Sequence, residues 1–167
     1  DPDGDGPLSE PEQTQTYDAA GNVASQTDAG NRTTTFEYDA WNRRTKTHLP
    51  PLTVGSTTYN VTQSQQYDLG GRVISQTDAL GRVTSYVYDD LDRLIQTILP
   101  HPDGGDPLTA PKITSTYDAV GNMLTQTDAL DHTTTYVYDA LNRLISTTLT
   151  DPDGDGPLSE PEQTQTY

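Results

Sequence analysis

The feature that most constrains this chain is an internal period of fifty residues. When residues 1–50, 51–100 and 101–150 are stacked without gaps, the first and third share 27 identical positions. The dipeptide Tyr-Asp begins at positions 17, 38, 67, 88, 117 and 138, so its steps alternate between 21 and 29 residues. Such a chain is predicted to be an array in which each unit packs against its neighbours.

A longer period lies above the first. The seventeen letters DPDGDGPLSEPEQTQTY stand at 1–17 and return unchanged at 151–167. We therefore expect three related units, 1–50, 51–100 and 101–150, with 151–167 opening the next 150-residue super-repeat of a longer array. The alternative is a finite domain with an accidental terminal duplication.

Composition limits the partners of such an array. The net charge is −16, so cations are the expected counterparts, and nucleic acid is not an expected partner. There is no Cys, and hydrophobic residues make up 31% of the chain. No apolar run approaches the roughly 20 residues of a membrane-spanning helix, so we expect no membrane-spanning segment.

Each unit reads as short strands separated by turns. In the first unit the strands are QTQTYDA, VASQTDA, TTTFEYDA and RRTKTHLP. Thr34, Phe36 and Tyr38 alternate onto one predicted face. Gly21-Asn22 and Gly30-Asn31 suit positive φ, and the Asp residues before such turns can accept bonds from backbone N–H groups. The predicted fold class is all-β, and the Tyr-Asp pairs are interpreted as structural.

The stretch YDAAGNVASQTDAGNRTTTFEYDAWNRR resembles the RHS/YD repeat, and the match recurs six times in register. The resemblance implies a ribbon of β-hairpins that winds into a spiral. In that family the ribbon often encloses a toxin in a hollow shell, or packs beside adhesive domains in secreted and surface proteins. Because the repeats here are nearly identical, we expect an extended spiral or solenoid, a fibre rather than a closed domain.

The opening stretch DPDGDGPLSEPE has the D-x-D-x-D-G-x5-E pattern of a calcium loop. Carboxylates on alternate residues can converge on one hard cation, a glycine allows the turn, and a final Glu can bind through both oxygens. The flanking prolines make the helices of an EF-hand improbable, and similar loops occur in dockerins and thrombospondin type 3 repeats. The predicted Ca²⁺ ligands of the two copies are Asp1, Asp3, Asp5, Pro7 and Glu12, and Asp151, Asp153, Asp155, Pro157 and Glu162.

The equivalent segments of the other units have lost this pattern. In HPDGGDPLTAPK, His101 replaces the first Asp and Lys112 the final Glu, and PLTVGSTTYNVT has none of the ligands. One calcium ion per 150 residues is therefore expected, where it would compensate for the low apolar content of the first unit. The alternative is an acidic, solvated linker.

No catalytic constellation emerges from the sequence. His48, His101 and His132 occupy three different registers of the repeat. The DPDG motif superficially resembles a family self-cleavage motif, but it lies inside the calcium pattern. We therefore predict that this segment is not an enzyme.

The leading functional prediction is a structural segment of a secreted microbial fibre or cell-surface stalk, braced by Ca²⁺. Its partners would be further copies of the same repeat along the fibre axis, and its location extracellular or at the cell surface. The alternative is a shell segment of an RHS-type polymorphic toxin or a contact-dependent adhesin. A weaker alternative is a glycan-binding module that uses Trp41 and Tyr59.

Overall fold

The computed structural model describes residues 13–101 and 110–149, and all twelve elements within these ranges are β-strands. The chain divides into two compact units, Asp1–Val83 and Thr84–Tyr167. The first contains β1 (Thr14–Tyr17), β2 (Val23–Thr27), β3 (Thr33–Tyr38), β4 (Arg44–Val54), β5 (Thr57–Tyr67) and β6 (Val73–Thr77). The second contains nearly all of β7 (Val83–Tyr88), then β8 (Leu94–Ile98), β9 (Lys112–Tyr117), β10 (Met123–Thr127), β11 (Thr133–Tyr138) and β12 (Leu144–Leu149).

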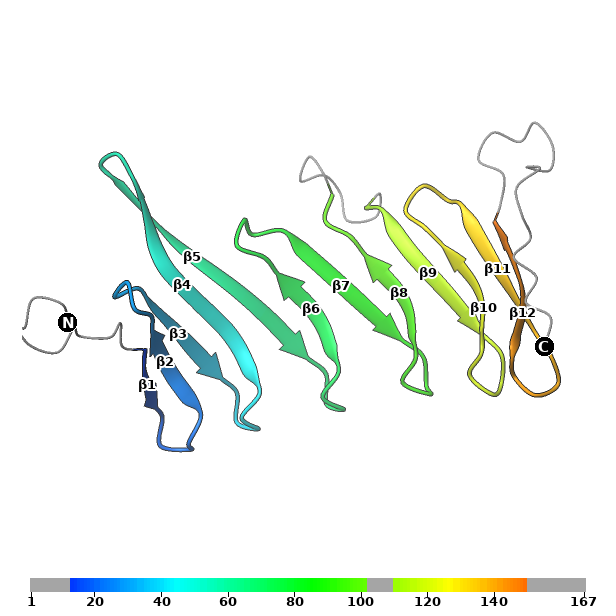
Figure 1. Ribbon diagram of the computed structural model, residues 1–167, viewed down its shortest axis with the longest axis horizontal. Coiled ribbons are helices and arrows are strands. Elements are labelled where there is room, and N and C mark those ends of the chain that lie inside the picture. Colours follow the sequence, from blue (N-terminus) through cyan, green and yellow to red (C-terminus); the bar gives the residue numbers. More distant parts are fainter. Residues whose placement is uncertain (1–12, 102–109, 150–167) are drawn as a thin grey trace, which may run out of the picture. The chain divides into compact units, whose positions relative to one another are not determined.

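Strand order in each unit is simply chain order (Figure 1), and consecutive strands pair antiparallel. The second unit repeats this arrangement from β7 to β12. The all-β ribbon of hairpins predicted from the sequence is therefore confirmed, and in neither unit does the sheet close on itself. The boundaries of the fifty-residue units remain a prediction.

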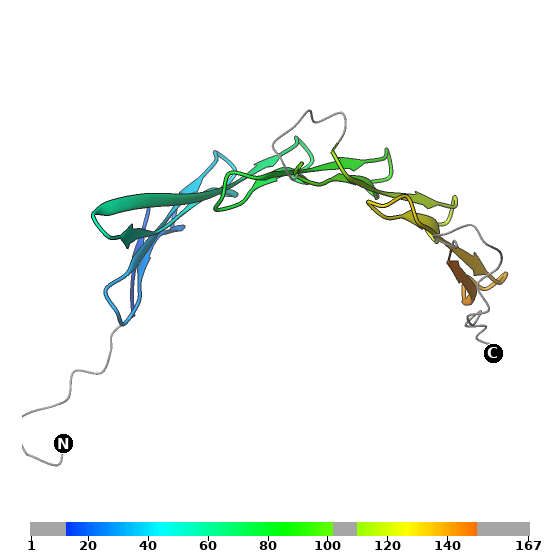
Figure 2. The ribbon, with the colours of Figure 1, turned by 90° about the horizontal axis from the view of Figure 1, so that it is seen from above.

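Each unit is one sheet thick, as the second view makes plain (Figure 2). Ala110, 7% exposed, is the one buried hydrophobic residue of the described ranges, which include no fully buried large side chain. The strand residues Ile95 and Ile98 are only half-buried. The sheet of each unit therefore has no core beneath it.

The predicted alternation of side chains is present. Thr34, Phe36 and Tyr38 are half-buried on one face of β3, while Thr33, Thr35 and Glu37 on the other face are exposed. Period-two alternation places successive side chains on opposite faces of a strand. The aromatic face and the hydroxyl-rich face of the ribbon are thus already encoded in the strand sequence.

Turns of two kinds lie at the two edges of the ribbon. One edge carries the turns that follow Tyr-Asp, at the bottom of Figure 1, and we call it the Tyr-Asp edge. The opposite edge, the Thr-Asp edge, carries the turns that follow Thr27, Thr77 and Thr127, together with the β4–β5 turn.

A register shift occurs in every hairpin of the Tyr-Asp edge, and at the other edge one occurs in the β4–β5 hairpin, between Leu49 and Leu52. Tyr38 pairs with Arg44 after a register shift, and Tyr138 pairs with Leu144 in the same way. At the Thr-Asp edge Thr27 pairs with Thr33 without a shift. A bulge bends the strand and increases its local twist, so each Tyr-Asp turn adds twist to the hairpin that carries it.

Candidate functional site

Within residues 13–101 and 110–149, the recurring chemistry is concentrated in nine turns, each of which begins with an aspartate. In the turn of Asp39, the Asp39 backbone N–H donates to the carbonyl of Arg43 at 2.9 Å, and Asn42 N–H donates to the Asp39 carbonyl at 3.0 Å. This is the pattern of a type I turn followed by a left-handed residue. The same backbone bonds recur at every member of the set, which comprises Asp18, Asp28, Asp39, Asp68, Asp78, Asp89, Asp118, Asp128 and Asp139.

The aspartate side chain completes the turn. Asp39 Oδ1 accepts the backbone N–H groups of Trp41 and Arg43 at 2.9 and 3.0 Å, and Oδ2 accepts Nε of Arg43 at 2.7 Å. In three of the turns the fifth residue is Asn22, Asn122 or His132, whose side-chain nitrogen takes the place of the guanidinium. The carboxylate thus satisfies backbone donors that the tight turn leaves without a strand partner.

The fourth residue of each turn has positive φ, from 57° at Asn31 to 99° at Gly121. Only Gly, Asn and Asp occupy this position, the residue types that tolerate the left-handed region. The sequence predicted positive φ at Gly21-Asn22 and Gly30-Asn31, but only Gly21 and Asn31 have it. The prediction was wrong at Asn22 and at Gly30 because the aspartate, not the glycine, sets the register of the turn.

These hydrogen bonds hold the pKa of the turn carboxyls below its usual range. For Asp28 the largest cause is the backbone N–H of Arg32, followed by the Arg32 guanidinium. For Asp78 the guanidinium of Arg82 comes first and its backbone N–H second. The pKa is lowered at all nine turn aspartates. Such carboxyls are poorly suited to general acid catalysis near neutral pH.

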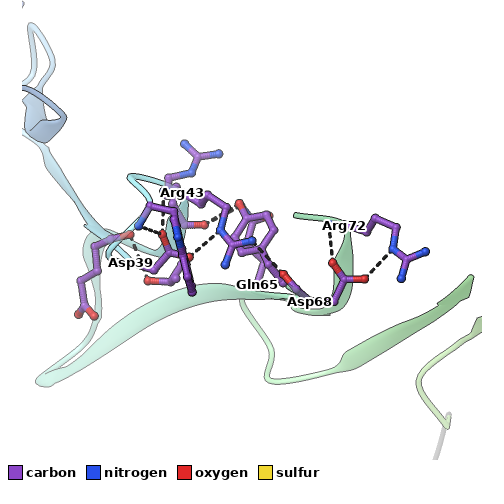
Figure 3. Close-up of polar contacts among 10 residues, drawn as sticks. Asp39, Arg43, Gln65, Asp68 and Arg72 are labelled. Atoms are coloured by element: carbon purple, nitrogen blue, oxygen red, sulfur yellow. Dashed lines mark hydrogen bonds and ion pairs between the residues drawn. The ribbon is translucent and has the colours of Figure 1, made fainter. Parts of the chain in front are cut away.

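Neighbouring turns of the Tyr-Asp edge are tied to one another. Arg43 Nη1 donates to the carbonyl of Asp68 in the next turn at 3.0 Å (Figure 3), and its guanidinium lies 4.4 Å from the centre of the Tyr67 ring. Asn22 Nδ2 donates to Asn42 Oδ1 at 2.9 Å. In the second unit Arg93 reaches the Asp118 carbonyl, and Asn122 reaches Asn142, in the same way.

The tyrosine of the Tyr-Asp pair has a second role that the sequence did not reveal. Tyr38 Oη donates to the carbonyl of Val23, and Tyr67 Oη to the carbonyl of Arg44, both at 3.0 Å. Tyr117 repeats this with Leu94. Each of these hydroxyls therefore ties its strand to the first residue of the preceding strand that leaves a Tyr-Asp turn.

One charged cluster interrupts the hydroxyl-rich face of the first unit. Glu37 accepts Lys46 Nζ at 2.8 Å and bonds His48 Nε2 at 2.7 Å, and His48 Nδ1 lies 3.0 Å from Thr62 Oγ1. Hydrogen bonds from Lys46, then His48, lower the pKa of Glu37. Sequence reasoning missed this cluster because its three residues are spread over two strands.

The predicted calcium ligands, Asp1 to Glu12 and Asp151 to Glu162, lie outside the described residues. Within residues 13–101 and 110–149, no group of three His, Asp or Glu side chains is placed to hold a metal ion. In the same ranges no helix has the length and apolar character needed to cross a membrane. Trp41 and Tyr59, considered for glycan binding, are exposed at 68% and 52%. Trp41 stacks with Arg43 on the Tyr-Asp edge, whereas Tyr59 lies in β5 near the opposite edge.

Comparison with known proteins agrees with this repeated geometry. The RHS Repeat family profile matches residues 17–50, 67–105 and 117–155. The chain belongs to the RHS repeat family. A search of curated proteins returned no significant match.

Several solved structures share the fold of this RHS chain. A TcdB2-TccC3-Cdc42 crystal structure superposes with a TM-score of 0.67 at 24% identity, and TcdB2-TccC3 without its hypervariable C-terminal region with 0.66 at 26%. A Tc holotoxin pore from Photorhabdus luminescens that carries a TccC3 mutation gives 0.66 at 25%. Each match covers 81% of this chain and 7% of the solved chain.

The leading prediction, a structural segment of a secreted fibre or cell-surface stalk, is wrong. Its calcium part falls on residues outside the described ranges and stays a prediction. The solved structures named above, which share this RHS ribbon, are of Tc toxin proteins, and this favours the alternative, a toxin shell segment. The error has a physical origin. Near-identical repeats fix the same turn and hairpin each time, but they do not determine whether the resulting ribbon extends or winds into a wall.

Proposed function

We propose that this chain is a segment of the wall of an RHS-type polymorphic toxin shell, with no catalytic role of its own. The observation that carries the proposal is the match of 81% of the chain to TcdB2-TccC3 structures. The family profile supports it. The chain spans only 7% of the length of those proteins, so the shell would be built from many more repeats than these.

The one-layer sheet supports a wall. A wall one sheet thick exposes both of its faces, so its shape cannot depend on a buried core. The nine aspartate turns, the links between neighbouring turns and the tyrosine hydroxyl bonds stiffen the ribbon through its own backbone. The absence of large buried side chains from the described residues is the burial expected of one layer.

The proposal is tested on the longer polypeptide that would carry these repeats. Negative-stain electron microscopy is expected to show closed hollow particles, and segments inside the shell should resist protease until the particle is opened. Open rods, or protease sensitivity equal to that of a denatured control, would contradict it. Release of the protein outside the cell, checked by fractionation, tests the proposed extracellular or cell-surface location.

We also propose that the two intact acidic loops bind Ca²⁺ within this wall, on the strength of their ligand pattern. Native mass spectrometry of the 167-residue chain is expected to show two bound ions. Asp3→Asn with Glu12→Gln should remove one, and Asp153→Asn with Glu162→Gln the other. Asp103→Asn, in the segment that lacks the pattern, is the matched control and should change nothing. Unchanged ion counts in both loop variants would contradict the proposal.

A further inference from the structure

The β4–β5 hairpin extends beyond the rest of the ribbon. β4 and β5 have eleven residues each, whereas the other strands have four to six. β3 pairs with β4 only as far as His48, and β6 pairs with β5 from Ser64 onward. Residues 50–61, which we call the arm, therefore pair only within the β4–β5 hairpin and stand clear of the neighbouring β2–β3 turn at the Thr-Asp edge (Figure 1).

The arm is amphipathic. Leu52 pairs with Tyr59, and Val54 with Thr57, so these side chains share one face, on which Leu52, Val54 and Tyr59 are 58%, 61% and 52% exposed. The opposite face is polar, with Thr53 Oγ1 3.3 Å from Thr58 Oγ1. An exposed apolar face on a projecting ribbon is typical of an interaction surface.

Two further features define how the arm can bind. Pro50 and Pro51 have no backbone N–H, which blocks addition of another strand along the β4 side of the arm. Residues 49–67 contain no Asp, Glu, Lys, Arg or His, although the chain has a net charge of −16. The apolar face is therefore one available contact surface, and it lacks the acidic side chains that the rest of the chain carries.

The opposite edge offers a matching surface. The third residue of the Tyr-Asp turns is an exposed apolar side chain at several positions, including Trp41 at 68%, Leu91 at 64%, Val120 at 70% and Leu141 at 72%. Leu69, the second residue of its turn, is 96% exposed. The opening aspartates of these turns accept hydrogen bonds from their own turn residues, whereas Asp90 and Asp92, which flank Leu91, are exposed.

We propose that the apolar face of the arm docks on the apolar turn tips of a neighbouring stretch of the same repeats. Close approach of two strongly acidic ribbons is least opposed where acidic side chains are fewest. The arm has none, and the turns of Val120 and Leu141 each have a single carboxylate that is hydrogen-bonded within its own turn. A contact between unlike surfaces of one repeating unit propagates from strip to strip. This inference rests on the proposed function, because in a shell one winding of ribbon lies beside the next.

Because the chain contains no Cys, a thiol introduced at one position can report the contact by forming a disulfide. Val54→Cys and Leu141→Cys variants of the 167-residue chain are mixed in equal amounts and mildly oxidised, and disulfide-linked dimers are identified by non-reducing gel and mass spectrometry. The mixed dimer is expected to exceed both homodimers several-fold. Thr53→Cys, on the polar face of the same arm, is the matched control and should give only background with Leu141→Cys. Equal yields from the two arm positions, or a dominant Val54→Cys homodimer, would overturn the proposal.

Sedimentation equilibrium supplies a second readout that does not require a new thiol. Leu52→Thr with Tyr59→Thr keeps good strand formers in the arm and should weaken self-association at least five-fold, whereas Thr53→Ser with Thr58→Ser should leave it unchanged. Equal association of the two variants contradicts the docking. These measurements test only the contact between the arm and the turn tips, so a negative result would not contradict the proposed shell. Open rods in electron micrographs would contradict the shell but not the contact.

Discussion

The β3–β4 hairpin of the first unit and the β11–β12 hairpin of the second occupy the same place in the repeat but carry different faces. Their registers coincide, because Phe36 pairs with Thr47 where Tyr136 pairs with Thr147, and the bulge follows at the same point. Their turns are built by Asp39 and Asp139 with the same hydrogen bonds.

The exposed faces of these hairpins differ in kind. The first carries the Glu37, Lys46 and His48 cluster, and the second has Val137 and Ser146 opposite each other, with Thr148 beside them. Identical backbones under unlike faces indicate that the turn chemistry specifies the hairpin and that the face is free to vary. This separation suits a wall element, because the residues of its exposed face can change while the turns keep the hairpin fold.

Low pH is expected to have the largest effect on stability, because it protonates the turn carboxylates of both hairpins together. Their pKa is lowered in the folded protein, so the stability they contribute is fully present above the unfolded value and is lost as pH falls below about 4. Trp41 fluorescence, which reports the β3–β4 turn, and far-UV circular dichroism are expected to change together. Fluorescence that changes well before the dichroism would show that the two hairpins do not depend on the same chemistry.

A single turn should show the same dependence on a smaller scale. Asp39→Ala and Asp139→Ala each remove the acceptor of two backbone N–H groups and one guanidinium, and we expect each to lower Tm by about 3–6 °C. Asp39→Ala should be at least as severe, because Arg43 also reaches the next turn. Ala40→Ser, in the same turn but outside these bonds, is the control. An Asp139→Ala protein with unchanged Tm would separate the two hairpins and contradict the common mechanism.

The inter-turn arginine should contribute less than the aspartate. Arg43→Lys keeps the charge but loses the planar donor group that stacks on Tyr67 and reaches the Asp68 carbonyl. We expect a loss of about 1 kcal/mol in the free energy of unfolding, measured by urea denaturation. If Arg43→Lys is as stable as the parent, the stacking and the bond to the next turn add nothing beyond charge.

Local features of these hairpins could be predicted from the sequence, and long-range ones could not. The strand faces and the aspartate turns follow from residue types within a few positions, such as Thr34, Phe36 and Tyr38 on β3. The Tyr38 hydroxyl bond to Val23, the Arg43 bond to Asp68 and the projecting arm depend on which strands become neighbours, and no local pattern encodes them. Whether the ribbon forms a fibre or a shell depends on how it winds, and residues within a few positions of one another do not determine the winding.

The smallest effect is expected when one face is exchanged for the other. The variant Glu37→Val, Lys46→Ser, His48→Thr copies the β11–β12 face onto β3–β4 and removes ion pairs that are 38–47% exposed. Exposed ion pairs contribute little, so Tm should change by no more than about 2 °C, and cross-strand nuclear Overhauser contacts should retain the Phe36–Thr47 register. Added salt should lower the Tm of the parent slightly more than that of the variant. Salt screens the shared charges equally in both proteins, and only the parent has the charged cluster. A variant that loses the register would show that the cluster helps to specify the hairpin, and the turns would then no longer suffice to explain why the two backbones coincide.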